Sequence, residues 1–122
     1  LMGKGLCTVD YYMKAIDYMR KHINNPHFYV FTDNPCWVKD NLPEFEYMLV
    51  DWNEVSGKRN FRDMQLMSCA KHNIIGNSTY SWWAAWLNAN QDKIVVGPKR
   101  FFNPINSFFS TCDIMCEDWI SL

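Results

Sequence analysis

The sequence predicts one α/β domain in which a Rossmann-like parallel sheet is covered by helices on both faces. Two observations support this prediction. Four short apolar runs have strand character, and helical patterns separate them. Consecutive strand-helix units need right-handed crossovers and produce a parallel sheet with helices on each face. A chain of 122 residues can bury one core, so residues 1–122 are expected to form a single domain.

The first predicted helix follows Thr8, whose hydroxyl is a suitable N-cap. Apolar side chains recur after it at steps of four, three and four residues, which is the spacing of one helix face. This stripe comprises Tyr12, Ile16, Met19 and Ile23. Pro26 cannot continue a helix, so the helix is expected to end before it.

Two strand-helix units are expected next. Phe28–Thr32 is aromatic and β-branched, and Pro35 suits the first turn of a helix that runs through Lys39. A second strand is predicted at Tyr47–Val50. After a polar loop, Asn60 can cap the next helix.

The last predicted elements are a short strand at Ile74–Gly76, a helix at Trp82–Asn90 and a strand at Lys93–Val96. At least one of Trp82, Trp83 and Trp86 is expected in the core, because they fall on different sides of one helix. The tail from Phe101 to Leu122 reads as irregular, with a turn or helix start at Asn103-Pro104.

Composition excludes several classes of protein. The net charge of −1 gives no field for binding nucleic acid, and no apolar run is long enough to span a membrane. The start of the sequence lacks the pattern of a signal peptide. Five cysteines without a C-x-x-C pair indicate reduced thiols in a cytoplasmic protein rather than a disulfide framework or zinc site. The sequence contains no P-loop, G-x-G-x-x-G, H-E-x-x-H, G-x-S-x-G or D-x-D motif, so neither a cofactor nor a metal is expected.

In a parallel sheet, ligands bind beyond the carboxyl ends of the strands. The most informative of these ends is the segment Gly76-Asn77-Ser78-Thr79-Tyr80-Ser81. Glycine permits close backbone approach, three hydroxyl groups cluster, and the following helix presents N–H groups to an anion. A phosphate group would fit there. The alternative is that Ser78 or Thr79 only caps the helix.

Asp63 lies near the start of the preceding helix and can face the same crevice. Its carboxylate could accept two hydrogen bonds from a guanine edge, or it could be a solvated acidic residue stabilised by the helix dipole. His72 could be a catalytic base, but a lone histidine at a helix end is more often a partner of the C-terminal dipole or a packed imidazole. Lys99 and Arg100 could pair with phosphate or be ordinary surface charges.

The segments NFRDMQLMSCAKHNIIGNSTYSWWAAWLN and KIVVGPKRFF closely resemble the C-terminal region of bacterial α-1,2-fucosyltransferases, and FYVFTDNPCWVK is also similar to that family. The resemblance runs from about Thr8 to about Phe102. The family's His-x-Arg-Arg-x-Asp motif, whose arginine holds the donor phosphates, is absent. The chain therefore resembles a fragment that lacks the N-terminal acceptor-side domain and the first donor-binding strand.

The resemblance implies an inverting, metal-independent GT-B enzyme, of which this chain is the GDP-sugar-binding domain. Such an enzyme moves L-fucose from GDP-fucose to the O2 of a terminal β-galactoside. By resemblance, Asp63 recognises guanine, and Ser78, Thr79 and Ser81 hold the diphosphate. Asn77, Tyr80, His72 and Lys99 are further candidates, the catalytic base is unassigned, and membrane association is left to the full-length protein. Two alternatives stay open: an inactive or isolated nucleotide-sugar-binding module, and an enzyme of another class or donor specificity.

Overall fold

A computed structural model of the chain describes residues 7–101 and 114–122. The described part is an α/β structure in which all strand pairs are parallel, as expected. The predicted turn at Asn103-Pro104 lies outside the described residues. The helices are α1 (Val9–His22), α2 (Pro35–Asn41), η1 (Gly57–Arg59), α3 (Phe61–Ser68) and α4 (Thr79–Leu87), and the strands are β1 (Phe28–Phe31), β2 (Tyr47–Val50), β3 (Asn73–Ile74), β4 (Val95–Gly97) and β5 (Ile120–Ser121).

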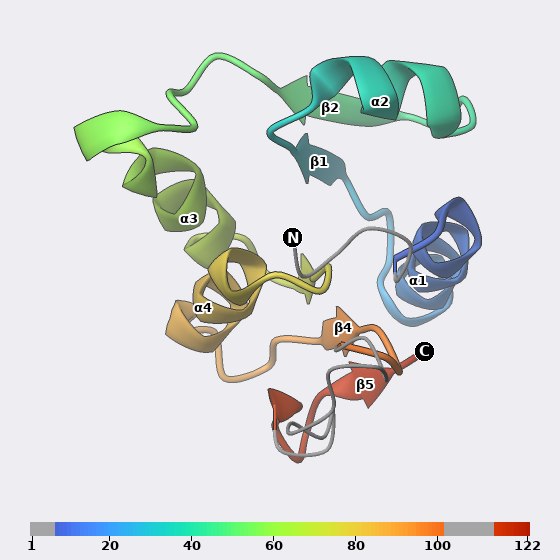
Figure 1. Cartoon of the computed structure of the whole chain (residues 1–122). Coiled ribbons are helices and arrows are strands. Elements are labelled where there is room, and N and C mark those ends of the chain that lie inside the picture. The colour runs from blue at the N-terminus through green and yellow to red at the C-terminus, as the bar shows by residue number, and fades with distance from the viewer. Residues whose placement is uncertain (1–6, 102–113) are drawn as a thin grey trace.

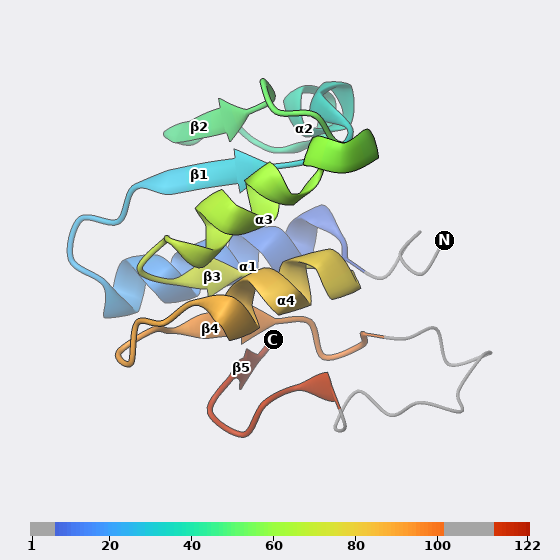
Figure 2. The same cartoon turned by 90° about the vertical axis from the view of Figure 1, so that its left-hand side faces the viewer.

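The strands form a layer between two groups of helices. Helices α3 and α4 lie on one side of this layer and α1 on the other, as the two perpendicular views show (Figures 1 and 2). The expectation of helices on both faces is therefore confirmed.

The expectation of one continuous sheet is corrected. Strands β1 and β2 pair with each other, and β3, β4 and β5 form a second sheet in that order. Within the described residues β1 does not pair with β3, so the backbone ladder is interrupted between the two sheets. Strand β5, in the tail expected to be irregular, extends the second sheet through Leu122, whose N–H donates to the Gly97 carbonyl at 3.0 Å.

Helix α1 carries the main core. Its buried stripe is Tyr11, Ala15, Ile16 and Met19, and it packs against Val96 of β4 and Ile74 of β3. The predicted stripe is corrected at its first position, because Tyr11 rather than Tyr12 is the buried residue there. Tyr12 is half-buried and turns toward the loop after β3. The predicted Thr8 cap is confirmed by its hydroxyl, which accepts from the Tyr11 N–H at 3.2 Å.

Two predicted boundaries move for local reasons. Helix α4 begins at Thr79 rather than Trp82, because the Ser78 hydroxyl accepts from the Ser81 N–H at 3.2 Å and so starts the helix three residues earlier. Strand β3 ends at Ile74, and the carbonyl of the next residue, Ile75, accepts from the Tyr11 hydroxyl at 2.6 Å. The predicted Phe28–Thr32 and Lys93–Val96 strands shift by one or two residues, whereas Tyr47–Val50 is confirmed as written.

Buried amides join α3, β3 and α4. The Asn88 side chain donates to the Ala70 carbonyl and to Asn73 Oδ1, both at 2.8 Å, and Asn73 donates in turn to the Met67 carbonyl at 2.8 Å. Lys93 Nζ donates to the carbonyls of Ala85 and Asn88 at 2.8 Å, which satisfies acceptors at the end of α4. These bonds hold α4 in place and therefore set the position of its amino end.

Candidate functional site

The hydroxyl-rich segment that precedes α4 lies at the carboxyl end of β3, where the sequence places a ligand site. Ser78 Oγ lies 3.0 Å from Ser81 Oγ and caps the Ser81 N–H. Ser81 is 8% exposed, and its single proton has the carbonyls of Ser78 (3.0 Å) and Gly76 (3.2 Å) within reach. Ser78 therefore caps α4, and the buried Ser81 hydroxyl stabilises the loop through the carbonyls of Ser78 and Gly76.

Capping leaves donors available at the tip of α4. The first N–H with a carbonyl partner in the helix is that of Trp82, which donates to Ser78 at 3.1 Å. The N–H groups of Thr79 and Tyr80 precede it and have no partner inside the helix, because the first turn of any helix lacks one. Ser78 and Thr79 are exposed. Together with the helix dipole, these groups form a surface that favours an anion.

A second helix begins at the same edge. The first turn of α1 carries Tyr11, whose hydroxyl reaches the carbonyl of Ile75, the residue just before Gly76. The amino ends of α1 and α4 therefore flank the end of β3. Both contribute positive potential there, which adds to the preference for negative charge.

Asp63 lies in the first turn of α3 but is 6% exposed, so the solvated alternative is wrong. Its Oδ1 accepts from Asn53 Nδ2 at 2.8 Å, which ties α3 to the loop that follows β2. In this structure the carboxylate braces that loop. Contact with a guanine base stays a prediction, and it would require the Asn53 loop to give access to the carboxylate.

Tyr80 links α4 to the start of α3. Its hydroxyl donates to the Asn60 carbonyl at 2.6 Å and accepts from the Met64 N–H at 2.8 Å. The expected cap at Asn60 is corrected, because Asn60 occupies the N-cap position with a helical backbone and its side chain makes no capping bond. Tyr80 supplies the missing acceptor for the Met64 N–H, from 16 residues away.

The remaining candidates do not all lie at the loop: His72 is at the opposite end of β3, whereas Asn77 and Lys99 are at the carboxyl edge. His72 precedes β3 and lies at the amino end of that strand, away from the Gly76 loop. Its Nδ1 accepts from the Ile94 N–H at 2.9 Å, and burial, with a smaller contribution from Lys71, lowers its pKa. Lys99 follows β4 and is exposed at the carboxyl edge, where its N–H donates to Leu122 at 2.9 Å. Asn77 is 7% exposed, within the loop itself.

Two further residues that contact the loop were not among the sequence candidates. The Tyr12 hydroxyl and the Cys7 thiol lie close enough to affect each other's pKa, and the Asn77 backbone also acts on the thiol. A Cβ placed on Gly76 would stand 2.9 Å from the Tyr12 hydroxyl, so a larger residue here would force Tyr12 to shift. Burial raises the pKa of both Tyr12 and Cys7. In the sequence, the signal for the contact of Tyr12 with the loop was the pair of adjacent tyrosines after the Thr8 cap. The periodicity, however, assigned Tyr12 to the core.

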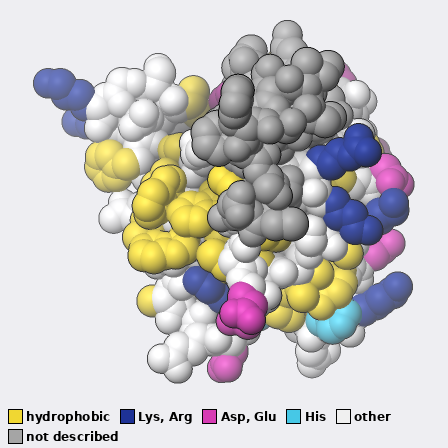
Figure 3. Space-filling view, turned by 60° about the horizontal axis from the view of Figure 1, so that its bottom comes forward, with side chains coloured by type: hydrophobic (Ala, Val, Ile, Leu, Met, Phe, Trp, Pro, Cys, Tyr) yellow, Lys and Arg dark blue, Asp and Glu magenta, His cyan; other side chains and the backbone are white. Residues whose placement is uncertain are grey.

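The outer side of α4 is apolar. Trp82 packs on the core and donates its indole N–H to the Ile114 carbonyl at 2.7 Å, whereas Trp83 and Trp86 are 47% and 53% exposed. The expectation that at least one of these tryptophans lies in the core is confirmed in the sense that Trp82 packs there. Figure 3 shows hydrophobic side chains gathered on one face, with few charged groups among them.

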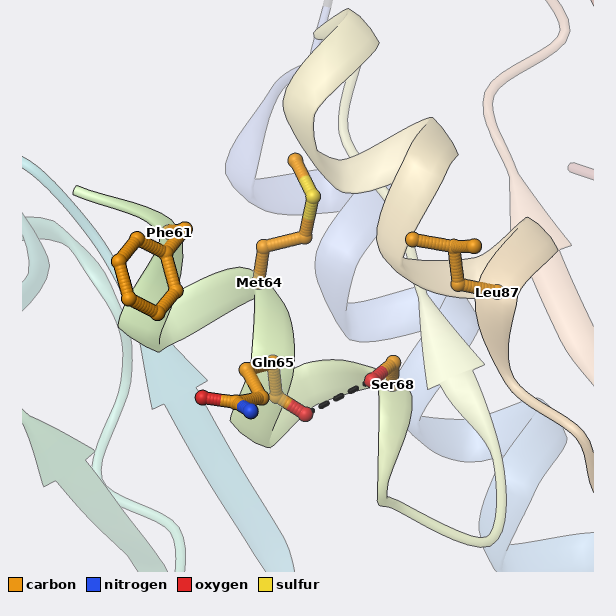
Figure 4. A pocket seen from close by; sticks show the side chains of 5 residues that line it. All are labelled: Phe61, Met64, Gln65, Ser68 and Leu87. Atoms are coloured by element: carbon orange, nitrogen blue, oxygen red, sulfur yellow. Dashed lines mark hydrogen bonds between the residues drawn. The ribbon is translucent and has the colours of Figure 1, made fainter. Parts of the chain in front are cut away.

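A shallow pocket of about 230 Å³ lies between α3 and α4 (Figure 4). Its lining is mostly apolar, and its one internal hydrogen bond runs from the Ser68 hydroxyl to the Gln65 carbonyl at 2.7 Å. It offers no charged side chain for an anion, so the amino end of α4 remains the candidate site. The lining residues are Phe61, Met64, Gln65, Ser68 and Leu87.

In the part of the chain that the structure describes, no group of three or more His, Cys, Asp or Glu side chains is placed to hold a metal ion. No helix among the described residues has the length and apolarity needed to cross a membrane.

The fold and this site define a parallel α/β domain that offers helix N-termini to an anionic ligand. Comparison with known proteins specifies the family: the profile described as Glycosyl transferase family 11 matches residues 3–122, and the chain belongs to that family. The chain is 40% identical over 119 residues to the O-antigen biosynthesis glycosyltransferase WbnK of Escherichia coli, covering 97% of this chain and 37% of that protein. It is 38% identical over 120 residues to an Alpha-1,2-colitosyltransferase of Escherichia coli, covering 97% and 40%. No solved structure matches.

The chain thus spans about two fifths of the length of the curated relatives it matches. Membership of the family confirms the resemblance drawn from the sequence.

Proposed function

We propose that the chain is the donor-binding part of a metal-independent GT-B glycosyltransferase that moves L-fucose from GDP-fucose to the O2 of a terminal β-galactoside. The observation that carries the proposal is the capped amino end of α4 at the carboxyl end of a parallel strand, in a chain of glycosyl transferase family 11.

The proposed chemistry follows from this geometry. The N–H groups of Thr79 and Tyr80, the Thr79 hydroxyl and the dipole of α4 would bind the diphosphate, while Ser78 and Ser81 hold the loop in shape. When the glycosidic bond breaks, negative charge accumulates on the leaving diphosphate. Donors that are already aimed at those oxygens bind the transition state more tightly than the ground state and lower the barrier.

Asp63 is the proposed selector of the base, because a carboxylate accepts from both donors on the guanine edge. Because Asn53 donates to Oδ1 of Asp63, guanine recognition requires that Asn53 release or share this oxygen when the nucleotide binds. No residue of the chain is proposed as the catalytic base.

A second donor is favoured by one relative. The Alpha-1,2-colitosyltransferase is 38% identical to this chain, and colitose is L-fucose without its 3-hydroxyl. A site that binds that hydroxyl would reject colitose strongly, whereas an apolar site would tolerate both sugars. The two donors therefore need to be compared directly.

Transfer by the full-length protein tests the proposal. The protein is incubated with GDP-fucose or GDP-colitose and a β-galactoside, and the linkage in the product is determined by NMR. We expect an α-1,2-linked product from GDP-fucose. Transfer of colitose alone would correct the donor, and binding without transfer of either sugar would favour an inactive binding module.

A matched pair of serine variants tests the role of α4. Ser78→Ala removes a cap that bonds the Ser81 N–H, and Ser56→Ala changes an N-cap of η1 whose side chain makes no capping bond. Loss of a capping bond costs about 0.5–2 kcal/mol of helix stability. We expect Ser78→Ala to weaken donor binding and Ser56→Ala to leave it unchanged. Equal effects of the two substitutions on donor binding would show that the α4 terminus has no special role in it.

A further inference from the structure

We propose that Tyr11 is a positioning residue for the Gly76–Ser81 loop, because its hydroxyl holds the peptide unit between Ile75 and Gly76 in the orientation that donor binding needs. The proposal rests on the proposed function of that loop as the phosphate site.

The contact is short and shielded from water. Tyr11 Oη donates to the Ile75 carbonyl at 2.6 Å, across 64 residues of sequence, and lies 3.3 Å from the Val96 carbonyl. The hydroxyl has one proton, and the Val96 carbonyl already accepts from the Ile75 N–H at 2.8 Å. The shorter bond therefore takes the proton. Tyr11 is 7% exposed, so water does not compete well for the Ile75 carbonyl.

The orientation of one carbonyl fixes the neighbouring N–H. In a trans peptide unit the carbonyl of Ile75 and the N–H of Gly76 point in opposite directions. Since the carbonyl points toward Tyr11, the Gly76 N–H points away from α1. The next carbonyl, that of Gly76, lies within 3.2 Å of Ser81 Oγ. The peptide units on either side of Gly76 are thus fixed by α1 and by α4.

Tyr12 restrains the same glycine by contact. Its hydroxyl would stand 2.9 Å from a Cβ at position 76, and its ring packs against that of Tyr11 with centroids 5.0 Å apart. The two tyrosines therefore act on neighbouring groups of one loop: Tyr11 holds the carbonyl before Gly76, and the Tyr12 hydroxyl fills the space where a side chain at position 76 would lie. Burial raises the pKa of both phenols, so both hydroxyls stay protonated near neutral pH.

The test is Tyr11→Phe in the full-length protein, which removes the hydroxyl and keeps the ring. Loss of one such hydrogen bond predicts a rise of about five- to tenfold in the Kd for GDP and in the KM for GDP-fucose. The KM for the acceptor should stay unchanged. Tyr18→Phe is the matched control, because Tyr18 lies on the same helix and stacks on His22 near its far end.

A purely structural role predicts a different result: a lower melting temperature with an unchanged Kd for GDP, measured where both proteins are folded. That outcome overturns the proposal while leaving the proposed function intact. Failure of the unsubstituted protein to bind GDP would refute both.

A second set of variants keeps the proposal testable if Tyr11→Phe does not fold. Gly76→Ala should weaken GDP binding, because the added methyl group meets the Tyr12 hydroxyl. Adding Tyr12→Phe removes that obstacle and should restore most of the affinity. Absence of any rescue would show that contact between α1 and the loop does not set donor affinity.

Discussion

Replacing Tyr80 by phenylalanine tests whether its hydroxyl binds the donor or only stabilises the fold. The substitution removes a hydroxyl that donates to the Asn60 carbonyl at 2.6 Å and accepts from the Met64 N–H at 2.8 Å. Each such bond contributes about 0.5–1.5 kcal/mol net. Tyr80 is half-buried, so water can partly replace the lost partners. The expected loss is therefore about 1–2 kcal/mol of unfolding free energy, toward the lower end of the sum of the two bonds.

The assay is chemical denaturation of the full-length protein followed by tryptophan fluorescence, with GDP binding measured by calorimetry at low denaturant. We expect a lower midpoint for Tyr80→Phe and a Kd for GDP within about twofold of the unsubstituted value, because the α4 terminus keeps its Ser78 cap. An unchanged midpoint with a tenfold weaker Kd would refute this reasoning and make Tyr80 a donor-binding residue.

Three further predictions follow from the site. Asp63→Ala should weaken GDP binding by about 1–3 kcal/mol with ADP binding unaffected; a sharp fall in melting temperature without a change in GDP affinity would leave only the bond to Asn53 as its role. Treatment with a chelator should leave transfer unchanged, and activity that is lost and then restored by Mg²⁺ would contradict metal independence. Burial lowers the pKa of His72, and its neutral Nδ1 accepts from Ile94. The stability from this bond is therefore present above the unfolded pKa of about 6.5 and is lost as the pH falls through the folded value. His72→Gln should flatten that acid-side loss in melting temperature, and an identical pH profile in both proteins would contradict the assignment.

Much of the fold follows from local sequence signals. Thr8 and Pro35 marked two helix starts, and the apolar run Tyr47–Val50 marked a strand, because capping, proline geometry and β-branched composition act over a few residues. The interruption between β1 and β3 did not follow, since pairing depends on which strands lie side by side. Strand β5 was missed because its two residues carry no periodicity.

The site divides in the same way. The cluster of Ser78, Thr79 and Ser81 was visible because hydroxyl side chains at a strand-helix junction are a local pattern. The supports of that junction were not visible. Tyr11 acts on Ile75 from 64 residues away, and Tyr80 caps α3 from the following helix. Such contacts depend on packing, which residue spacing alone does not specify.

Calorimetric titration of the full-length protein with GDP, UDP and ADP tests the central claim most directly, because base selectivity and diphosphate binding are read in one series. The three ligands share the diphosphate, so any difference in affinity arises from the base. We predict that GDP binds at least tenfold more tightly than UDP or ADP, without added metal. Equal affinity for all three would contradict guanine recognition, and no binding of any of them would contradict a nucleotide-sugar site at the amino end of α4.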